Sequence, residues 1–104
     1  MNQFCAYVNA DAASRRTIPY WLIVQNDLID ATQSRVVVPL IAPQLAGPLV
    51  ARLMPVLVVA GKRLVMDAAQ ITNVPMQMLG RHEADLSAER LTILAALDML
   101  ISGI

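Results

Sequence analysis

The chain has 104 residues, of which 57% are hydrophobic and 15% are charged, and its eight basic residues balance its eight acidic ones. This length predicts one domain over residues 1–104, and zero net charge argues against a nucleic-acid-binding protein, which needs a basic surface to displace phosphate counterions. A small domain with this hydrophobic content cannot bury all its apolar side chains. We therefore expect a homodimer or an obligate partner that covers the rest.

Alternating and β-branched apolar residues predict five to seven short, mostly antiparallel strands. The clearest are residues 3–9, 18–24, 35–41, 54–60, 62–68 and 74–80, the last ended by Gly80. Residues 10–17 are small and polar and predict an exposed loop. Pro39 cannot donate to a strand ladder, so it predicts an edge or a bulge. Ala60-Gly61 predicts a hairpin turn.

A helix is predicted from Ser87 to the end of the chain, because the apolar spacing changes there to three and four residues. Ser87 is the expected N-cap, with Glu89 in the first turn. The apolar residues fall on two sides: Leu91, Leu94, Leu97, Ile101 and Ile104 on one, and Ile93, Ala96 and Leu100 on the other. A helix of this kind is buried on both sides, one against the sheet and one against a second subunit or a target.

No residue pattern predicts catalysis, a cofactor or a metal site. His82 is the only histidine and stands among charged residues, so it is interpreted as a solvated turn residue. Cys5 lies in a predicted strand and is interpreted as a small buried hydrophobic residue. A single cysteine, no recognisable signal segment and no apolar run of membrane-spanning length together predict a cytoplasmic protein without membrane contact.

Three surfaces remain as candidate binding sites. The first is the polar loop with Arg15 and Arg16, and the second is the apolar pair Leu28-Ile29. The third is the C-terminus, residues 100–104. These surfaces indicate a protein that acts through contact with other proteins.

Several segments resemble the CcdB toxins in the order and spacing typical of that family. They are Gln3-Phe4, residues 24–30 (VQNDLID), 35–40 (RVVVPL), 54–56 (MPV), 73–75 (NVP), 84–87 (ADLS) and Gly103-Ile104. The resemblance covers essentially the whole chain and is weakest over residues 8–17 and 42–53. It implies a bacterial toxin of a toxin–antitoxin system, such as those that maintain plasmids, with an SH3-like barrel, a small extra antiparallel sheet and one C-terminal helix.

The resemblance also implies the partners and their sites. CcdB toxins are homodimers that poison DNA gyrase by binding its A subunit, without catalysis, and a CcdA-like antitoxin neutralises them. Family positions for the gyrase contact fall on Asp98, Leu100, Ile101, Ser102, Gly103 and Ile104, with Leu28, Ile29 and Phe4 nearby. Positions for the antitoxin contact fall on Asp11, Ser14, Arg15 and Arg16.

One position departs from the family pattern, in which a tryptophan precedes the final Gly-Ile and stacks on an arginine of gyrase. Ser102 stands there in this chain. Loss of a cation–π contact weakens binding by about 0.5–2 kcal/mol. Two other hypotheses therefore stay open: a ribonuclease toxin on the related MazF-like barrel, and a homologue that binds antitoxin but no longer poisons.

Overall fold

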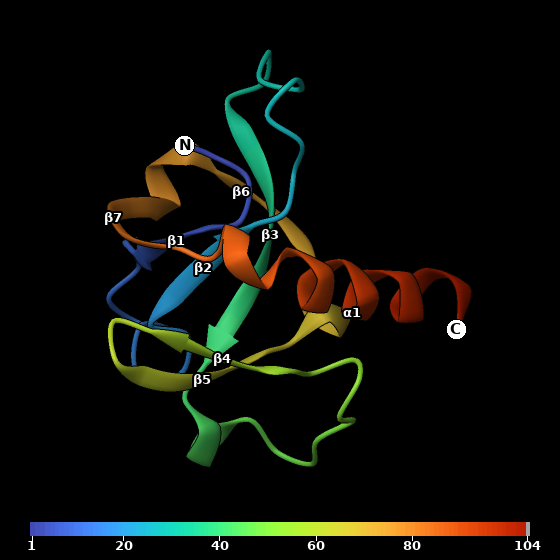
Figure 1. Cartoon of the computed structure of the whole chain (residues 1–104). Helices are drawn as coiled ribbons and strands as arrows, with labels where there is room; N and C mark the ends of the chain where they lie inside the picture. Colours follow the sequence, from blue (N-terminus) through green and yellow to red (C-terminus); the bar gives the residue numbers. More distant parts are fainter. Residues whose placement is uncertain (104) are drawn as a thin grey trace.

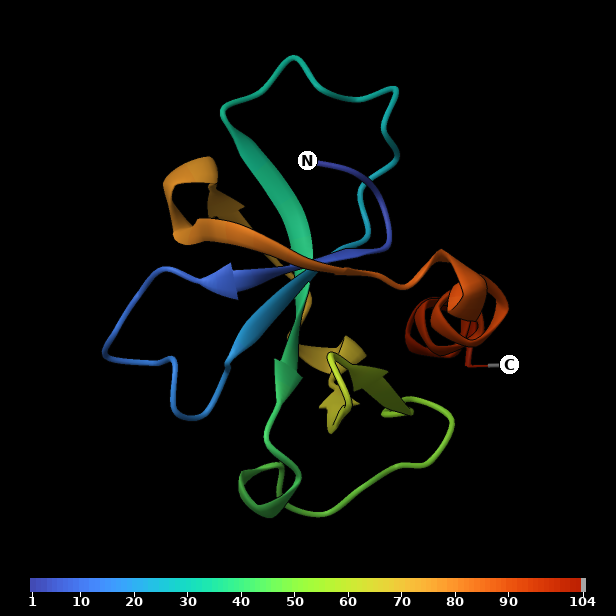
Figure 2. The ribbon, with the colours of Figure 1, turned by 60° about the vertical axis from the view of Figure 1, so that its left-hand side comes forward.

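The computed structural model describes residues 1–103, which form one curved antiparallel sheet with a helix packed beside it (Figures 1 and 2). The strands are β1 (Cys5–Asn9), β2 (Tyr20–Ile23), β3 (Ser34–Ile41), β4 (Val56–Val59), β5 (Lys62–Met66), β6 (Thr72–Pro75) and β7 (Leu79–Asp85), and the helix is α1 (Arg90–Ser102). The strand order is β4-β5-β3-β2-β1-β7, and β6 also pairs with β3. The expected mainly β fold with one C-terminal helix is confirmed.

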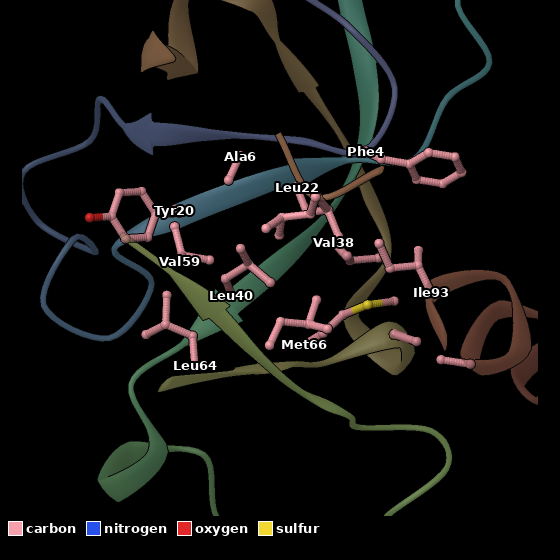
Figure 3. Packing of buried hydrophobic residues seen from close by; sticks show 14 residues of the cluster. Phe4, Ala6, Tyr20, Leu22, Val38, Leu40, Val59, Leu64, Met66 and Ile93 are labelled. Atoms are coloured by element: carbon pink, nitrogen blue, oxygen red, sulfur yellow. The ribbon is translucent and has the colours of Figure 1, made fainter. Parts of the chain in front are cut away.

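Alternate residues of the central strands point into two separate apolar clusters, because successive side chains of a strand face opposite sides of a sheet. Ala6, Leu22 and Val38 lie in the larger cluster, which α1 closes with Ile93 and Ala96 (Figure 3). Cys5, Tyr7, Trp21, Ile23 and Val37 lie in the smaller cluster, together with Val74 and Leu79. The buried position expected for Cys5 is confirmed, and burial raises the pKa of its thiol, to which the charge of Asp85 also contributes.

Pro39 is fully buried in the middle of β3, which pairs with three strands, so its expected place at a sheet edge is wrong. The β6 pairing of β3 ends at Val37, and the β5 pairing begins at Leu40. Pro39 therefore lies where one neighbour has ended and the next has not begun. Because neither β5 nor β6 pairs with Pro39, its missing N–H costs no hydrogen bond to either strand.

The hairpin expected at Ala60-Gly61 joins β4 to β5 through a two-residue loop. Both residues have positive φ, 50° at Ala60 and 80° at Gly61, as a type I′ turn requires. Alanine is strained in this left-handed region by about 1 kcal/mol, whereas asparagine is tolerated there.

Replacing Ala60 with asparagine is expected to raise the free energy of unfolding by about 0.5–1 kcal/mol, because Asn-Gly is the preferred type I′ pair. Urea denaturation followed by circular dichroism measures the change. Gly61→Ala is the matched control and should lower the stability, since it adds strain in the same turn. A loss of stability in Ala60→Asn would contradict the assigned turn.

The strand expected at residues 74–80 is wrong at both ends. Pro75 ends β6, a short 3₁₀ turn (Met76–Met78) comes next, and β7 starts at Leu79 and continues to Asp85. Gly80 does not end a strand: a Cβ there would lie 3.0 Å from the carbonyl oxygen of Val8, so glycine lets β7 approach β1 closely. His82 consequently lies on an edge strand and not in a turn.

The start of α1 also differs from the prediction. Ser87 begins a separate 3₁₀ turn (Ser87–Glu89) and does not cap α1, whose N-cap is Glu89 without a side-chain hydrogen bond. The Ser87 N–H donates to Asp85 Oδ1 (2.9 Å), which holds the pKa of Asp85 below its usual value. No helix within residues 1–103 is long and apolar enough to cross a membrane.

Candidate partner-binding surfaces

The C-terminal end of α1 is an exposed apolar surface. Ile101 is 82% exposed, Leu100 is half-buried and Asp98 is exposed. Gly103 ends the helix in the left-handed conformation (φ 74°), and its N–H donates to the carbonyl of Met99 (2.9 Å). A glycine in this conformation stops the helix cleanly, so Ile101 lies in a well-defined last turn. Ile104, which belongs to the same prediction, lies outside the described residues.

Ser102 has its hydroxyl group bound within the helix. Its Oγ donates to the carbonyl of Asp98 (2.7 Å), one turn earlier. The side chain therefore satisfies a carbonyl near the helix end, a role typical of serine. It offers no ring for stacking, so any contact made by this end of α1 depends on Ile101 and the residues around it.

Leu28 and Ile29 form an exposed apolar tip on the loop between β2 and β3, 90% and 60% exposed. Local hydrogen bonds hold the loop: Asn26 Oδ1 accepts from the Leu28 N–H (2.8 Å), and Gln25 Nε2 donates to the carbonyl of Ile29. Asp27 Oδ1 accepts from the N–H of Gln3 (2.6 Å). Hydrogen bonds therefore hold the tip in place although its two apolar side chains are exposed.

The apolar tip and the end of α1 lie apart in one chain, at the top and the right of Figure 1 and separate again in Figure 2. Phe4 lies at neither surface. It is only 4% exposed and packs in the larger cluster with Ile93, so its expected place at the binding surface needs correction. Its positive φ of 64° is held by backbone hydrogen bonds to Ile23 and Leu86.

The loop at residues 10–17 is organised by Asn9, a fully buried residue. Asn9 Nδ2 donates to Ser14 Oγ (2.9 Å) and to the carbonyl of Ile18 (3.0 Å), and its Oδ1 accepts from the N–H of Asp11 (2.9 Å). Ser14 Oγ in turn donates to Asp11 Oδ2 (2.9 Å). The Arg15 guanidinium donates to the backbone carbonyl of Asn9 (2.7 Å).

Three of the four predicted antitoxin-binding residues, Asp11, Ser14 and Arg15, are thus brought together by their own hydrogen bonds. The side chain of Arg16 is exposed and makes no hydrogen bond within residues 1–103. Asn9 was not among the residues predicted from the sequence. An asparagine at the end of an apolar strand and before a polar loop was the available signal, since asparagine favours turns of this kind.

Asn9→Ala is expected to lower the free energy of unfolding by about 1–3 kcal/mol, because it leaves buried polar groups without partners. Urea denaturation measures the loss, and amide hydrogen exchange of Asp11 reports loosening of the loop. Asn73→Ala, at an exposed position of β6, is the matched control and should change the stability by less than about 0.5 kcal/mol. Equal effects of the two variants would show that Asn9 does not organise the loop.

The charged residues of β7 form a small polar cluster with Tyr20. Its hydroxyl donates to Glu83 Oε1 (3.0 Å), and Arg81 forms an ion pair with the same oxygen (3.4 Å). Burial and then the bond to Glu83 raise the pKa of Tyr20, so the phenol stays a donor. His82 is exposed and packs edge-on against Tyr7, with ring centroids 5.3 Å apart.

None of these groups is arranged as a catalytic pair or a metal site in the described part of the chain. Glu83 is engaged by Tyr20 and Arg81, and no group of three His, Cys, Asp or Glu side chains among residues 1–103 can hold a metal ion. The surface features described above are two apolar tips, an exposed basic side chain and a hydrogen-bonded polar loop.

The model of the family described as CcdB protein matches residues 3–103 of this chain. The chain belongs to the CcdB family. The resemblance seen in the ordered sequence segments is therefore confirmed, and so is the CcdB/MazF-like toxin fold.

Solved structures with this fold include endoribonucleases from mycobacterial species. One, in complex with its cognate antitoxin, superposes with a TM-score of 0.78 at 18% identity and covers 97% of this chain and 94% of its own. A second has a TM-score of 0.74 at 18% identity, with coverage of 97% and 90%. At such low identity these likenesses concern the fold alone.

Proposed function

We propose that this CcdB-family toxin inhibits DNA gyrase by binding its A subunit through the C-terminal end of α1, without catalysing a reaction. Membership of the CcdB family over residues 3–103 carries the proposal. The exposed Ile101 and the glycine-terminated helix support it, because an apolar side chain at a rigid helix end is a suitable anchor for a protein target. The gyrase contact comprises Asp98, Leu100, Ile101, Ser102, Gly103 and Ile104.

The protein acts in this proposal as a homodimer in the cytoplasm. α1 buries only Ile93 and Ala96 completely, while Leu91 at its first turn is 79% exposed. An apolar helix that covers a core with one side leaves its other side for a second subunit. Leu28-Ile29 and the end of α1 are apart in one chain. In a dimer, the apolar tip of one subunit and the helix end of the other can contact the same target.

A CcdA-like antitoxin is the second proposed partner, bound at the loop of residues 10–17. Asp11, Ser14 and Arg15 are fixed by the contacts of Asn9, and Arg16 is free to meet an acidic group. A loop already ordered loses little conformational freedom when it binds, which favours affinity.

A ribonuclease toxin remains the alternative, favoured by one observation: solved endoribonucleases share this fold. Catalysis would have to use the exposed Arg81 and His82, which lie next to each other on β7. Cleavage of cellular RNA upon induction, abolished by His82→Ala or Arg81→Ala, would replace the gyrase proposal.

The purified protein is tested with gyrase, supercoiled DNA and ATP. Stabilised DNA cleavage or inhibited supercoiling is the expected result, and no effect at micromolar protein would contradict the proposal. Expression in a gyrase-sensitive bacterial host is the companion measurement. Growth arrest is expected, and a harmless protein that still binds antitoxin would instead be the homologue that no longer poisons.

A further inference from the structure

Three strands of the sheet have an unpaired edge: β4 and β7 at the two ends of the strand order, and β6, which pairs with β3 alone and ends in Pro75, a residue that cannot donate to an added strand. β7, at one edge, carries Arg81, His82, Glu83 and Asp85. Charged side chains on an edge strand discourage pairing with another chain. β4, at the other edge, is Val-Leu-Val-Val and carries no charge. It pairs with β5 alone, and no described residue covers its other side with hydrogen bonds.

The backbone groups of Val56 and Val58 point away from β5. Val59 and Lys62 flank the two-residue turn and form a hydrogen-bonded pair. Hydrogen-bonded pairs recur at every second residue of an antiparallel ladder. The bond from the Met66 N–H to the carbonyl of Pro55 (2.9 Å), four residues before Val59, fits this alternation. The N–H and C=O groups of the intervening Val56 and Val58 are left for another strand.

The same two residues expose apolar side chains, Val56 by 43% and Val58 by 58%. Arg63 stands directly across from Val58 on β5 and shares its face of the sheet, whereas Lys62, across from Val59, lies on the other face. β4 and β5 together carry these two basic residues and no acidic one. The free edge of β4 is therefore an apolar strip beside a strand that carries two basic residues.

We propose that the edge of β4 binds an extended, acidic segment of a partner protein as an added strand. The segment would exchange backbone hydrogen bonds with Val56 and Val58, direct its acidic side chains to the face of those valines, toward Arg63, and place its alternate apolar side chains on the opposite face. Charge complementarity selects this occupant over a second copy. Two β4 edges paired together would bring two basic hairpins onto one sheet, with no acidic group on β4 or β5 to offset them.

This surface is separate from the loop that carries Leu28 and Ile29. β3 meets β5 at Leu40 and Ile41, whereas the loop that carries Leu28 and Ile29 precedes the opposite end of β3. Figure 1 shows the β4–β5 hairpin in the lower part of the molecule and that loop at the top. The inference consequently does not depend on gyrase as the target.

Fluorescence anisotropy tests the edge with a labelled peptide of about nine residues in which valine and glutamate alternate. A peptide with lysine in place of glutamate is the charge control and should bind at least about tenfold more weakly. Failure of the acidic peptide to bind at concentrations on the order of millimolar would overturn the proposal, as would equal binding of the two peptides.

Val58→Pro separates strand addition from other modes of binding. Proline removes the outward N–H, which the β4–β5 ladder does not use, and should weaken the acidic peptide at least about tenfold. Val58→Thr keeps the N–H and is the matched control, expected to bind like the unmodified protein. Thermal unfolding of both variants checks the fold. Equal binding by Val58→Pro and Val58→Thr would overturn strand addition.

Arg63→Glu provides a second variant that leaves the backbone of the edge intact. It should weaken the acidic peptide and strengthen the lysine peptide, because the charge across from Val58 is reversed. Sedimentation of the unmodified protein and of Val58→Pro identifies the competing occupant. If the unmodified protein self-associates and Val58→Pro loses that self-association, the edge binds a second copy and the proposal is overturned.

Discussion

Ile101→Lys is expected to abolish gyrase poisoning while the protein stays folded. Ile101 is 82% exposed, so the substitution removes no core contact. Lysine is a good helix former, and a cation is favourable near a helix C-terminus. Loss of an apolar anchor at the centre of an interface weakens binding by about 2–4 kcal/mol, or about 30- to 1000-fold. The concentration that half-maximally stabilises DNA cleavage by gyrase measures the effect.

Ala95→Lys is the matched control for this prediction. Ala95 is also exposed on α1 but lies on a different face from Ile101. It should poison gyrase as the unmodified protein does, and both variants should unfold at the same temperature within a few degrees. Undiminished potency of Ile101→Lys would remove the end of α1 from the gyrase site.

Ile93→Ala is expected to lower the free energy of unfolding by about 2–5 kcal/mol. Ile93 is fully buried and, with Ala96, fixes α1 to the larger apolar cluster (Figure 3). Alanine removes the contacts of Ile93 and leaves a cavity beside neighbours such as Phe4. Phe4 cannot move to fill this cavity, because hydrogen bonds hold its backbone on both sides. Guanidinium denaturation at fixed protein concentration measures the loss.

Ile29→Ala makes the same chemical change on the surface, where the side chain is 60% exposed. Its effect should stay within about 0.5 kcal/mol. A similar small effect of Ile93→Ala would mean that α1 is held to the sheet by something other than this contact. Activity of Ile93→Ala should fall with the population of folded protein and not independently of it.

Local patterns in the sequence were sufficient for the positions of most elements. Alternation predicted β1 and β2, and the run around Val37 predicted β3, because a period of two is a property of the strand itself. Ala60-Gly61 predicted its hairpin for the same reason. The three- and four-residue spacing predicted α1, although its cap was misplaced by the 3₁₀ turn at Ser87.

The misplaced features depend on contacts between distant segments. Whether Gly80 ends a strand or allows close packing is decided by the carbonyl of Val8, which is far away in the chain. Phe4 matched a surface position in the family pattern, yet the approach of α1 buries it. Pro39 is acceptable in a central strand only because two neighbouring strands leave a gap beside it.

The sequence by itself determined the fold class, the CcdB resemblance and the choice of Leu28-Ile29 as a surface feature, because these depend on local patterns and ordered motifs. Only the tertiary structure decided which surfaces are held rigid, which residues support them from beneath and which strand edge is left unpaired. Strand pairing and burial join residues far apart in the chain, and no local pattern carries that information. The free edge of β4 and the loop held by Asn9 are therefore properties of the folded molecule.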